Sequence, residues 1–386
     1  MLSIDRFTVV PPGVIEFGEG AVRALGAAVA SLGKTRAFVV TDAGLVRTGI
    51  VETVEQVLAG AGIGVEVFSE VEPNPSMATV ERASDRAWGF GDAAVVDVGG
   101  GLCLDAAKGI ALAAVNGGSA VGLAFAAGTA AAGLPVVAVP TTAGTGAETN
   151  GFGVIEDTVA CCKVYVGDAS VAPRISILDP ALTWGLPPAA TAATGVDALV
   201  HAVESLTSRG RNPVSEAHAH QAARLVGRWL PVAVADGSNR EARAQMLLGA
   251  HLAGLALSAS GLGLVHGIGH AVTAHTGAVH GVALAAVLDF VLDFNLPAAA
   301  RQYAGLAFDL GVGSTEAGEE VNARATIAAC RKLTEQTAVR TTLSDLGCRP
   351  QLVPDLARTA LADPVTRNTP RMPSDAELRG LLAAAL

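Results

Sequence analysis

The sequence predicts two kinds of fold in one chain: an N-terminal α/β domain built on a doubly wound parallel sheet, and a C-terminal all-α domain. Up to residue 185, short apolar runs alternate with helical periods, which is typical of a parallel sheet covered on both faces. From Ala189 onward strand patterns are hard to find, and Ala- and Leu-rich helical periods run almost to Leu386. A chain of 386 residues exceeds the usual size of one core, so we expect domains at 1–185 and 186–386.

The elements of the first domain can be placed in chain order. Apolar, β-rich runs predict buried strands at 37–41, 64–68, 93–98 and 136–140. Helical periods lie from Asp42 to Leu58, at 77–90 and from Leu102, and the segment VEPNPS at 71–76 predicts a loop. Residues 109–147 hold no charged side chain, but Gly, Asn and Pro divide them into pieces too short to cross a membrane, so we expect buried helix, loop and strand.

Composition narrows the choice of partners and compartment. Hydrophobic residues make up 51% and charged residues 16%, which favours a compact, well-buried protein. The net charge of −10 comes without any basic run, which argues against nucleic acid or an anionic membrane surface as a partner. The N-terminus has no apolar signal core and the five cysteines show no disulfide framework, so we expect a cytoplasmic protein.

Histidines crowd into one part of the chain, since all eight fall between His201 and His280. His266 and His270 are spaced i, i+4 and would share a helix face, and the glycines that follow end that helix and let His280 return to the same point. Upstream, Asp197 and His201 have the same spacing in a helical pattern. A lone histidine more often packs or caps a helix, but one carboxylate with two or three imidazoles suits Fe²⁺ or Zn²⁺.

One loop rich in glycine and one rich in threonine and glycine each follow a predicted strand. Gly99-Gly100-Gly101 opens the helix that carries Asp105, so its backbone amides could approach a phosphate. The spacing is not G-x-G-x-x-G, and a tight turn without a ligand is the alternative. PTTAGTGAE at 140–148 follows the strand 136–140, where parallel sheets bind ligands, and the alternative there is a flexible loop.

Four motifs together resemble the iron-containing, or group III, alcohol dehydrogenase family. They are GGGLCLDAAK, PTTAGTGAE, GVDALVHAVES and GLGLVHGIGH…VHG, and they occur in the order and spacing of that family. VEPNPS and the late NTPR at 368–371 are similar to its further landmarks, so the likeness spans nearly the whole chain. The resemblance implies an N-terminal dinucleotide-binding domain, a C-terminal helical domain, and an active site in the cleft between them.

The same resemblance implies a role for each matching residue. The metal ligands would be Asp197, His201, His266 and His280, and His270 would carry a proton. The cofactor contacts would be Asn74, Gly99, Gly100, Gly101, Asp105, Thr141, Thr142, Thr145 and Lys163. Asp42 ends the first strand, where a carboxylate would bind a ribose 2′-hydroxyl and repel a 2′-phosphate, so NAD is favoured over NADP. Phe152, Leu257 and Val365 would line an apolar pocket for a small or medium uncharged alcohol or aldehyde.

The implied reaction is that of an NAD-linked alcohol dehydrogenase. A metal bound to the alcohol oxygen would favour the alkoxide, and hydride would pass to the nicotinamide. Family members are commonly dimers or larger, so a homo-oligomer is expected.

Three positions depart from the family pattern, namely Leu102, Ala147 and Ala285. The alternatives are relatives with other substrates, such as maleylacetate reductase, which works without the metal, glycerol dehydrogenase or the lyase dehydroquinate synthase, and a non-catalytic sensor of metal and NAD.

Overall fold

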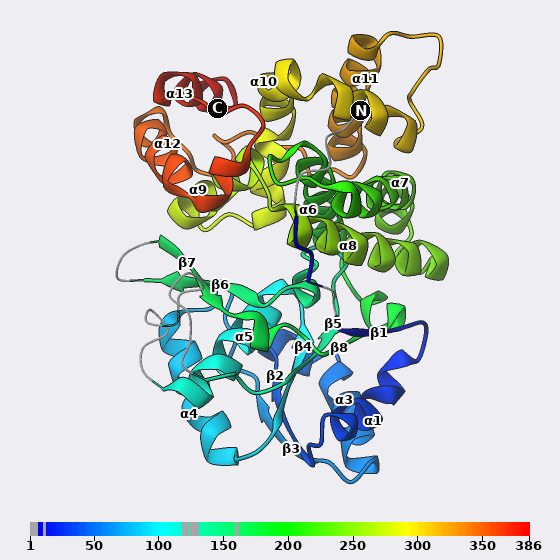
Figure 1. The fold of residues 1–386 in the computed structure, drawn as a ribbon, viewed down its shortest axis with the longest axis vertical. Coiled ribbons are helices and arrows are strands. Elements are labelled where there is room, and N and C mark those ends of the chain that lie inside the picture. Colours follow the sequence, from blue (N-terminus) through cyan, green and yellow to red (C-terminus); the bar gives the residue numbers. More distant parts are fainter. Residues whose placement is uncertain (1–6, 11–12, 118–122, 124–130, 159–161) are drawn as a thin grey trace. The chain divides into compact units, whose positions relative to one another are not determined.

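The computed structural model describes the whole chain except residues 1–6, 11–12, 118–122, 124–130 and 159–161. The chain forms two compact units, one of Pro11–Gly185 and the other of Leu186–Leu386 together with Met1–Val10. Figure 1 shows the first as a sheet with helices and the second as helices. The domain limits 1–185 and 186–386 stay a prediction.

A six-stranded parallel sheet forms the centre of the first unit. Its strands lie in the order β1 (Val14–Phe17), β8 (Ile175–Leu178), β5 (Val136–Pro140), β4 (Ala94–Gly99), β2 (Arg36–Val40) and β3 (Gly64–Phe68). A separate antiparallel pair is formed by β6 (Phe152–Asp157) and β7 (Cys162–Gly167). The α-helices are α1 (Leu25–Ser31), α2 (Ala43–Val46), α3 (Ile50–Gly60), α4 (Met77–Phe90) and α5 (Gly101–Asn116), with 3₁₀ turns at Ala21–Ala24, Ala147–Thr149, Ala169–Val171 and Pro180–Thr183.

Helices cover both faces of this sheet, as the doubly wound prediction requires. Phe38, Val40 and Val95 point to one face and pack with α4 and α5. Val39 and Val96, the alternate residues of the same strands, point to the other face and pack with α1 and α3. Both sets are fully buried, which explains why these strands are apolar along their whole length.

The strand order creates a switch point beside β2. From β2 the chain continues to β3 on one side and then returns to β4 on the other side, so connections leave this point in opposite directions. In open parallel sheets, ligands bind beyond the carboxyl ends of strands at such a point. Asp42 follows β2 and Gly99 ends β4, so two of the predicted cofactor residues lie there.

Three parts of this unit differ from the prediction or extend it. The helix expected up to Leu58 is two helices, because Gly49 adopts a left-handed backbone (φ 81°) between α2 and α3. The edge strand β1, its neighbour β8 and the pair β6–β7 were not predicted. Of the uncharged stretch 109–147, one end lies in α5 and the other contains β5, while 118–122 and 124–130 lie outside the described residues.

The second unit is helical. Its α-helices are α6 (Pro188–Thr207), α7 (Pro213–Ala235), α8 (Arg240–Ser260), α9 (Leu264–Thr276), α10 (His280–Asp309), α11 (Glu319–Gln336), α12 (Val353–Ala362) and α13 (Asp375–Ala384), with 3₁₀ turns η6 (Pro350–Leu352) and η7 (Pro364–Asn368). The central helix α6 packs against α7, α8 and α10. Helix α10 is long and apolar enough to cross a membrane, but 67% of its apolar window is buried, as in a core helix. Helices α8 and α9 together also have the required length and composition, but the chain bends by 104° between them.

Candidate functional site

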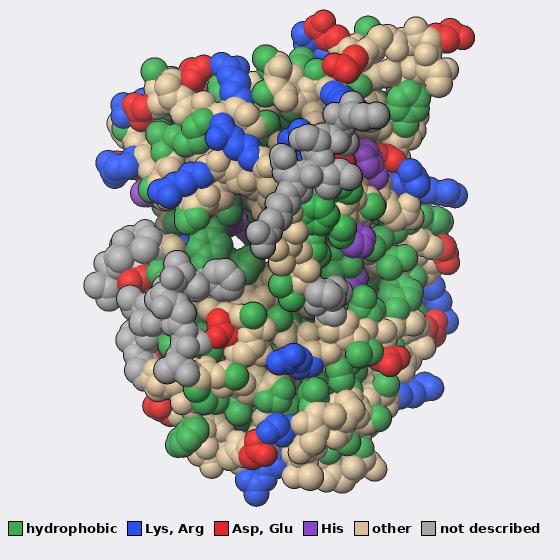
Figure 2. Space-filling model, in the orientation of Figure 1, with side chains coloured by type: hydrophobic (Ala, Val, Ile, Leu, Met, Phe, Trp, Pro, Cys, Tyr) green, Lys and Arg blue, Asp and Glu red, His purple; other side chains and the backbone are tan. Residues whose placement is uncertain are grey.

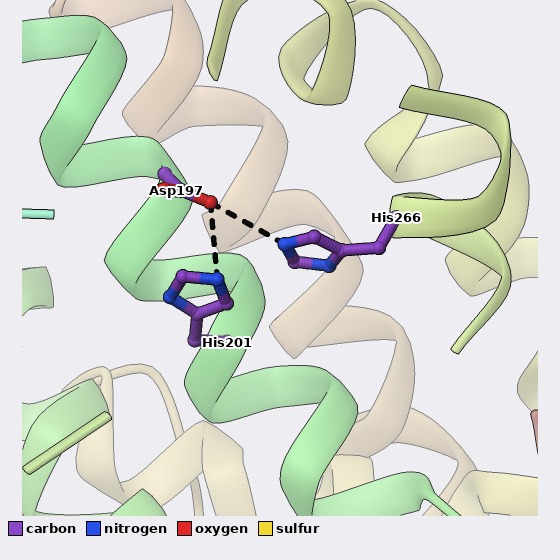
Figure 3. A group of neighbouring side chains, drawn as sticks. All are labelled: Asp197, His201 and His266. Atoms are coloured by element: carbon purple, nitrogen blue, oxygen red, sulfur yellow. Dashed lines mark hydrogen bonds and ion pairs between the residues drawn. The ribbon is translucent and has the colours of Figure 1, made fainter. Parts of the chain in front are cut away.

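Two helices of the second unit bring a carboxylate and two imidazoles together. Asp197 and His201 lie one turn apart on α6, and His266 comes from α9 (Figure 3). The Oδ1 atom of Asp197 lies 3.2 Å from Nε2 of His201 and 3.3 Å from Nε2 of His266. His280, the first residue of α10, points the same way, with its Nε2 atom 3.8 Å from that oxygen. Three imidazole nitrogens therefore converge on one carboxylate oxygen.

Glycines explain how α9 and α10 reach α6. Gly277 takes a left-handed backbone (φ 72°) and ends α9, so the chain turns before His280 begins α10. At Gly281 a Cβ atom would lie 2.0 Å from the carbonyl oxygen of Ala193 on α6, so no larger residue fits this contact. The start of α10 therefore rests directly on α6, one turn before Asp197.

The charges at this cluster are strongly coupled. Burial alone would raise the pKa of Asp197, but the imidazoles of His201, His266 and His280 bring it well below its usual value. Burial would lower the pKa of His266, yet hydrogen bonds to Asp197 and Glu204 raise it to about 9. Asp197, His201 and His266 are all buried, and their ligand atoms lie within 4.8 Å of one another. This set of nitrogen and oxygen donors around a buried anion fits a divalent transition metal.

His270 lies beside these residues with a partner of its own. Its Nδ1 atom is 2.8 Å from Oδ2 of Asp363, while its ring centroid is 5.9 Å from that of His266 and 5.3 Å from that of His280. Asp363 also caps η7, because its Oδ1 atom accepts a hydrogen bond from the N–H of Val365 (3.0 Å). The carboxylate of Asp363 thus orients the ring of His270 and also caps the N-terminus of η7.

Asp42 caps a helix at the carboxyl end of β2. Its Oδ1 atom accepts hydrogen bonds from the N–H groups of Gly44 (2.7 Å) and Leu45 (3.0 Å), at the start of α2. Its Oδ2 atom lies 3.6 Å from Sγ of Cys103, whose thiol has its pKa raised by burial and by nearby carboxylates. The buried Cys103 is thus a core residue, and Asp42 has one oxygen held by backbone N–H groups while the other lies against the Cys103 thiol.

The two predicted cofactor loops pack directly on each other. At Gly100 a Cβ atom would lie 3.2 Å from Cγ2 of Thr142, and at Gly101 it would lie 2.4 Å from Cγ2 of Thr145. The N–H of Thr141 donates to the carbonyl oxygen of Gly99 (2.8 Å) and continues the pairing of β4 with β5. The glycines are therefore needed for this contact as well as for any approach of a ligand to the helix N-terminus.

Three further predicted cofactor residues surround the start of β6 and β7. Nζ of Lys163 donates to Oδ1 of Asn74 (3.0 Å), and Asn74 adopts a left-handed backbone (φ 59°) that asparagine tolerates better than most residues. Burial lowers the pKa of Lys163, and the charges of Glu156 and Asp105 oppose this effect. Asp105 accepts a hydrogen bond from the N–H of Val154 (3.1 Å). The structure thus brings Asn74 and Lys163 together.

Comparison with known families identifies the protein class. A family model described as iron-containing alcohol dehydrogenase matches residues 12–180, and one described as the C-terminal part of the Fe-containing alcohol dehydrogenase family matches residues 191–386. The chain belongs to the iron-containing alcohol dehydrogenase family. The predicted family is therefore confirmed over almost the whole sequence.

Individual members of the family match over their full length. An NAD-dependent methanol dehydrogenase of Bacillus methanolicus is 34% identical over 383 residues, which are 99% of this chain and 100% of the relative. The crystal structure of a 1,3-propanediol oxidoreductase has a TM-score of 0.95 at 36% identity and covers 99% of this chain and 100% of that chain. The structure of a sulfoacetaldehyde reductase from Bifidobacterium kashiwanohense in complex with NAD⁺ has a TM-score of 0.88 at 28% identity and covers 99% of each chain.

These matches confirm three predictions. The fold class is that of the iron-containing alcohol dehydrogenases, and the protein is an oxidoreductase of the alcohol dehydrogenase type. NAD and iron are the cofactors of this family, so the cofactor prediction is confirmed at that level. The sensor alternative, in which the fold has lost catalysis, is set aside.

The roles of single residues stay predictions. The proposed pocket residues lie in different units: Phe152 begins β6 in the first, while Leu257 on α8 and Val365 on η7 belong to the second. Of the positions that depart from the family pattern, Leu102 is 43% exposed at the start of α5, whereas Ala147 and Ala285 are buried.

Sequence reasoning missed three acids near the site residues, of which Glu204 and Asp97 are buried. Glu204 contacts His266, Asp363 contacts His270, and Asp97 lies fully buried in β4. For Glu204 a signal existed, since it follows Asp197 by seven positions and His201 by three and so shares their helix face. Asp363 precedes a proline, as helix-capping residues often do, but nothing in the sequence points from it to His270.

Proposed function

We propose that this iron-containing alcohol dehydrogenase interconverts a small or medium uncharged alcohol and its aldehyde or ketone with NAD⁺ and NADH. Asp197, His201, His266 and His280 would hold Fe²⁺ or Zn²⁺. The observation that carries this proposal is the convergence of three imidazole Nε2 atoms on Oδ1 of Asp197. A divalent cation held there would act as a Lewis acid on the substrate oxygen.

The protein's own groups have distinct tasks in this proposal. The buried carboxylate of Asp197 supplies the negative charge that a cation needs among its imidazole ligands. His270 would accept the proton that the alcohol loses and return it in the reverse direction. Asp363 supports this task because its contact with Nδ1 fixes the orientation of the His270 ring.

The cofactor would bind at the switch point of the parallel sheet. The first turn of α5 offers backbone N–H groups from the glycine triplet to the pyrophosphate. Thr141, Thr142 and Thr145 add hydroxyl groups beside it. Asp42 would accept a hydrogen bond from the adenosine ribose through Oδ2, which supports NAD over NADP.

Other features of the chain support the proposed substrate, assembly and location. Phe152, Leu257 and Val365 are all apolar, which supports an uncharged substrate. On the face shown in Figure 2, Lys and Arg side chains are interspersed with acidic and hydrophobic ones, and with the net charge of −10 this supports neither a nucleic acid nor an anionic membrane as partner. Among the described strands β1 pairs with β8 alone and is exposed throughout, which supports a homo-oligomer. Cys103, Cys330 and Cys348 are free thiols, which supports a location in the reducing cytoplasm.

Three measurements test this proposal. Protein purified without oxygen should contain one Fe²⁺ or Zn²⁺ per chain by elemental analysis. With that metal, NAD⁺ and a panel of primary alcohols, absorbance at 340 nm should rise, and it should fall with NADH and the aldehydes. Metal-free protein that turns over at the same rate would contradict the proposed metal centre. Light scattering that gave 38.6 kDa at micromolar concentration would contradict the oligomer.

A further inference from the structure

Glu204 is buried behind the proposed metal ligands and does not face the centre of the cluster. It lies on α6, one turn after His201, and is 4% exposed. It contacts the proposed ligand His266 on the side of the ring that faces away from Asp197, where Oε2 of Glu204 lies 2.7 Å from Nδ1 of His266. The other ring nitrogen of His266, Nε2, faces Asp197 at 3.3 Å. The imidazole of His266 is therefore held between two carboxylates.

Glu204 also caps the helix that carries His266. Helix α9 begins after Gly263, which has no side chain to accept from the first N–H groups. Oε2 of Glu204 accepts from the N–H of Gly263 (3.0 Å), and Oε1 accepts from the N–H of Val265 (2.7 Å). A Cβ atom at Gly263 would lie 3.0 Å from Oε1, so this glycine keeps the approach open.

These contacts give both carboxylate oxygens of Glu204 acceptor roles. Three groups surround them: two backbone N–H groups, which can only donate, and Nδ1 of His266. An ionised carboxylate can only accept, so the proton of the neutral ring must sit on Nδ1. The lone pair of Nε2 then points toward Asp197, as a metal ligand requires.

We propose that Glu204 is a positioning residue for metal binding, which fixes His266 in the tautomer with Nε2 unprotonated and ties that ring to the start of α9. The inference rests on the proposed metal centre, because it assigns Glu204 the task of orienting His266, one of the proposed metal ligands. Carboxylates that hold a ligand histidine in this way typically contribute about 10–100-fold to metal affinity.

Glu204→Gln is the sharpest test because the side chain keeps its shape. An amide has one oxygen and one NH₂ group, so at least one of the three donors would face another donor. The affinity of purified metal-free protein for Zn²⁺, measured by competition with a chromogenic chelator, should fall about 10–100-fold. Glu204→Asp, which keeps two acceptor oxygens, should recover part of this loss.

Asp363→Asn is the matched control for metal affinity. It changes the carboxylate that holds His270, which is not a proposed ligand, so Zn²⁺ affinity should stay within about twofold of the unmodified protein. A second readout is the ¹⁵N spectrum of histidine-labelled, metal-free protein above pH 9, where the His266 ring is neutral; the His266 signals are assigned by their loss in His266→Ala. Glu204→Gln should move the proton of His266 from Nδ1 toward Nε2.

The outcomes separate this inference from the proposed function. If Glu204→Gln binds Zn²⁺ normally with an unchanged His266 tautomer while His266→Ala has lost it, the metal centre stands and the inference is wrong. A Glu204→Gln variant that loses only thermal stability would likewise reduce Glu204 to a helix cap. If His266→Ala also binds Zn²⁺ normally, the proposed metal centre itself is wrong.

Discussion

The Nδ1 atom of His270 lies 2.8 Å from the Oδ2 atom of Asp363, although the two residues are 93 positions apart in the chain. The contact depends on Gly267, one turn before His270, where a Cβ atom would lie 1.9 Å from Oγ1 of Thr366. This glycine lets η7 approach α9 and brings Asp363 to the histidine. His270 therefore has a fixed ring and its own acid partner, unlike an ordinary packed histidine.

His266 and His270 should respond differently to removal, although one helical turn separates them. His266→Ala should lose the metal and nearly all turnover together, because only Asp197 and two imidazoles would remain as ligands. His270→Ala should keep stoichiometric metal and bind NADH normally, while kcat falls ~10²–10⁴-fold with an altered pH–rate profile. Elemental analysis and steady-state rates would check both. Metal retained in His266→Ala but lost in His270→Ala would reverse the two roles.

Removing the acid partner of His270 should have a smaller effect of the same kind. Asp363→Ala leaves Nδ1 of His270 and the N–H of Val365 without their acceptor. We expect kcat to fall by less than the ~10²–10⁴-fold expected for His270→Ala, which removes the proton carrier itself. The metal content should be unchanged. Asp355→Asn, at an exposed carboxylate on α12, serves as the control and should keep the unmodified rate. Equal rates in Asp363→Ala and the unmodified protein would show that this contact has no part in turnover.

Cofactor choice should depend on the charge of Asp42. Asp42→Asn keeps an oxygen for the N–H groups of Gly44 and Leu45 but removes the negative charge. Repulsion of a 2′-phosphate at ~4 Å is worth on the order of 1–4 kcal/mol, so the preference for NADH over NADPH should narrow by about fivefold or more. Asp42→Gly, which costs a helix cap only a few tenths of a kcal/mol, should narrow it similarly. Equal kcat/KM with both cofactors in the unmodified protein would contradict the role of Asp42.

Asp97 should make stability depend on pH. It is fully buried in β4, and among the described residues neither carboxylate oxygen has a hydrogen-bond partner. Burial raises its pKa well above the usual value, although Lys108 opposes the effect. Its native pKa exceeds its unfolded value, so the unfolded chain loses this proton first and stability falls as pH rises from about 4 to the native pKa.

Asp97→Asn should remove this penalty. Its free energy of unfolding should exceed that of the unmodified protein at pH 7, and the difference should grow between pH 5.5 and 8.5 by up to ~1.4 kcal/mol per unit. Urea denaturation at several pH values measures this difference. A difference that stayed constant, or a variant less stable at every pH, would mean that Asp97 is ionised in the native protein.

Local patterns in the sequence predicted the inner sheet and the helices around it. Strands such as β4 and β5 are continuous apolar runs because both faces are buried, and this gives a clear signal. The outer strand β1 is exposed at every position, so its residues VIEF carry no burial pattern to detect. The break at Gly49 was missed because a single left-handed glycine does not disturb the apolar period around it.

For the site, the sequence predicted what shares a helix but not what meets across helices. The i, i+4 pairs Asp197–His201 and His266–His270 follow from helical geometry alone. The contact of Glu204 with His266, 62 positions away, depends on how α6 packs against the start of α9. The contact of Asp363 with His270 likewise needs η7 in place. Such pairs are set by tertiary packing, and periodicity carries no information about them.

The close contact between Gly101 and Thr145 has a consequence for how these two loops can change. A Cβ atom at position 101 would lie 2.4 Å from the threonine methyl group, so the two positions share the space of a single side chain. A larger residue at 101 would require a smaller one at 145, and neither loop can be redesigned alone. Because the two loops pack on each other through their own atoms, we expect NAD to meet a binding surface that is already shaped, so that little conformational entropy is lost when it binds.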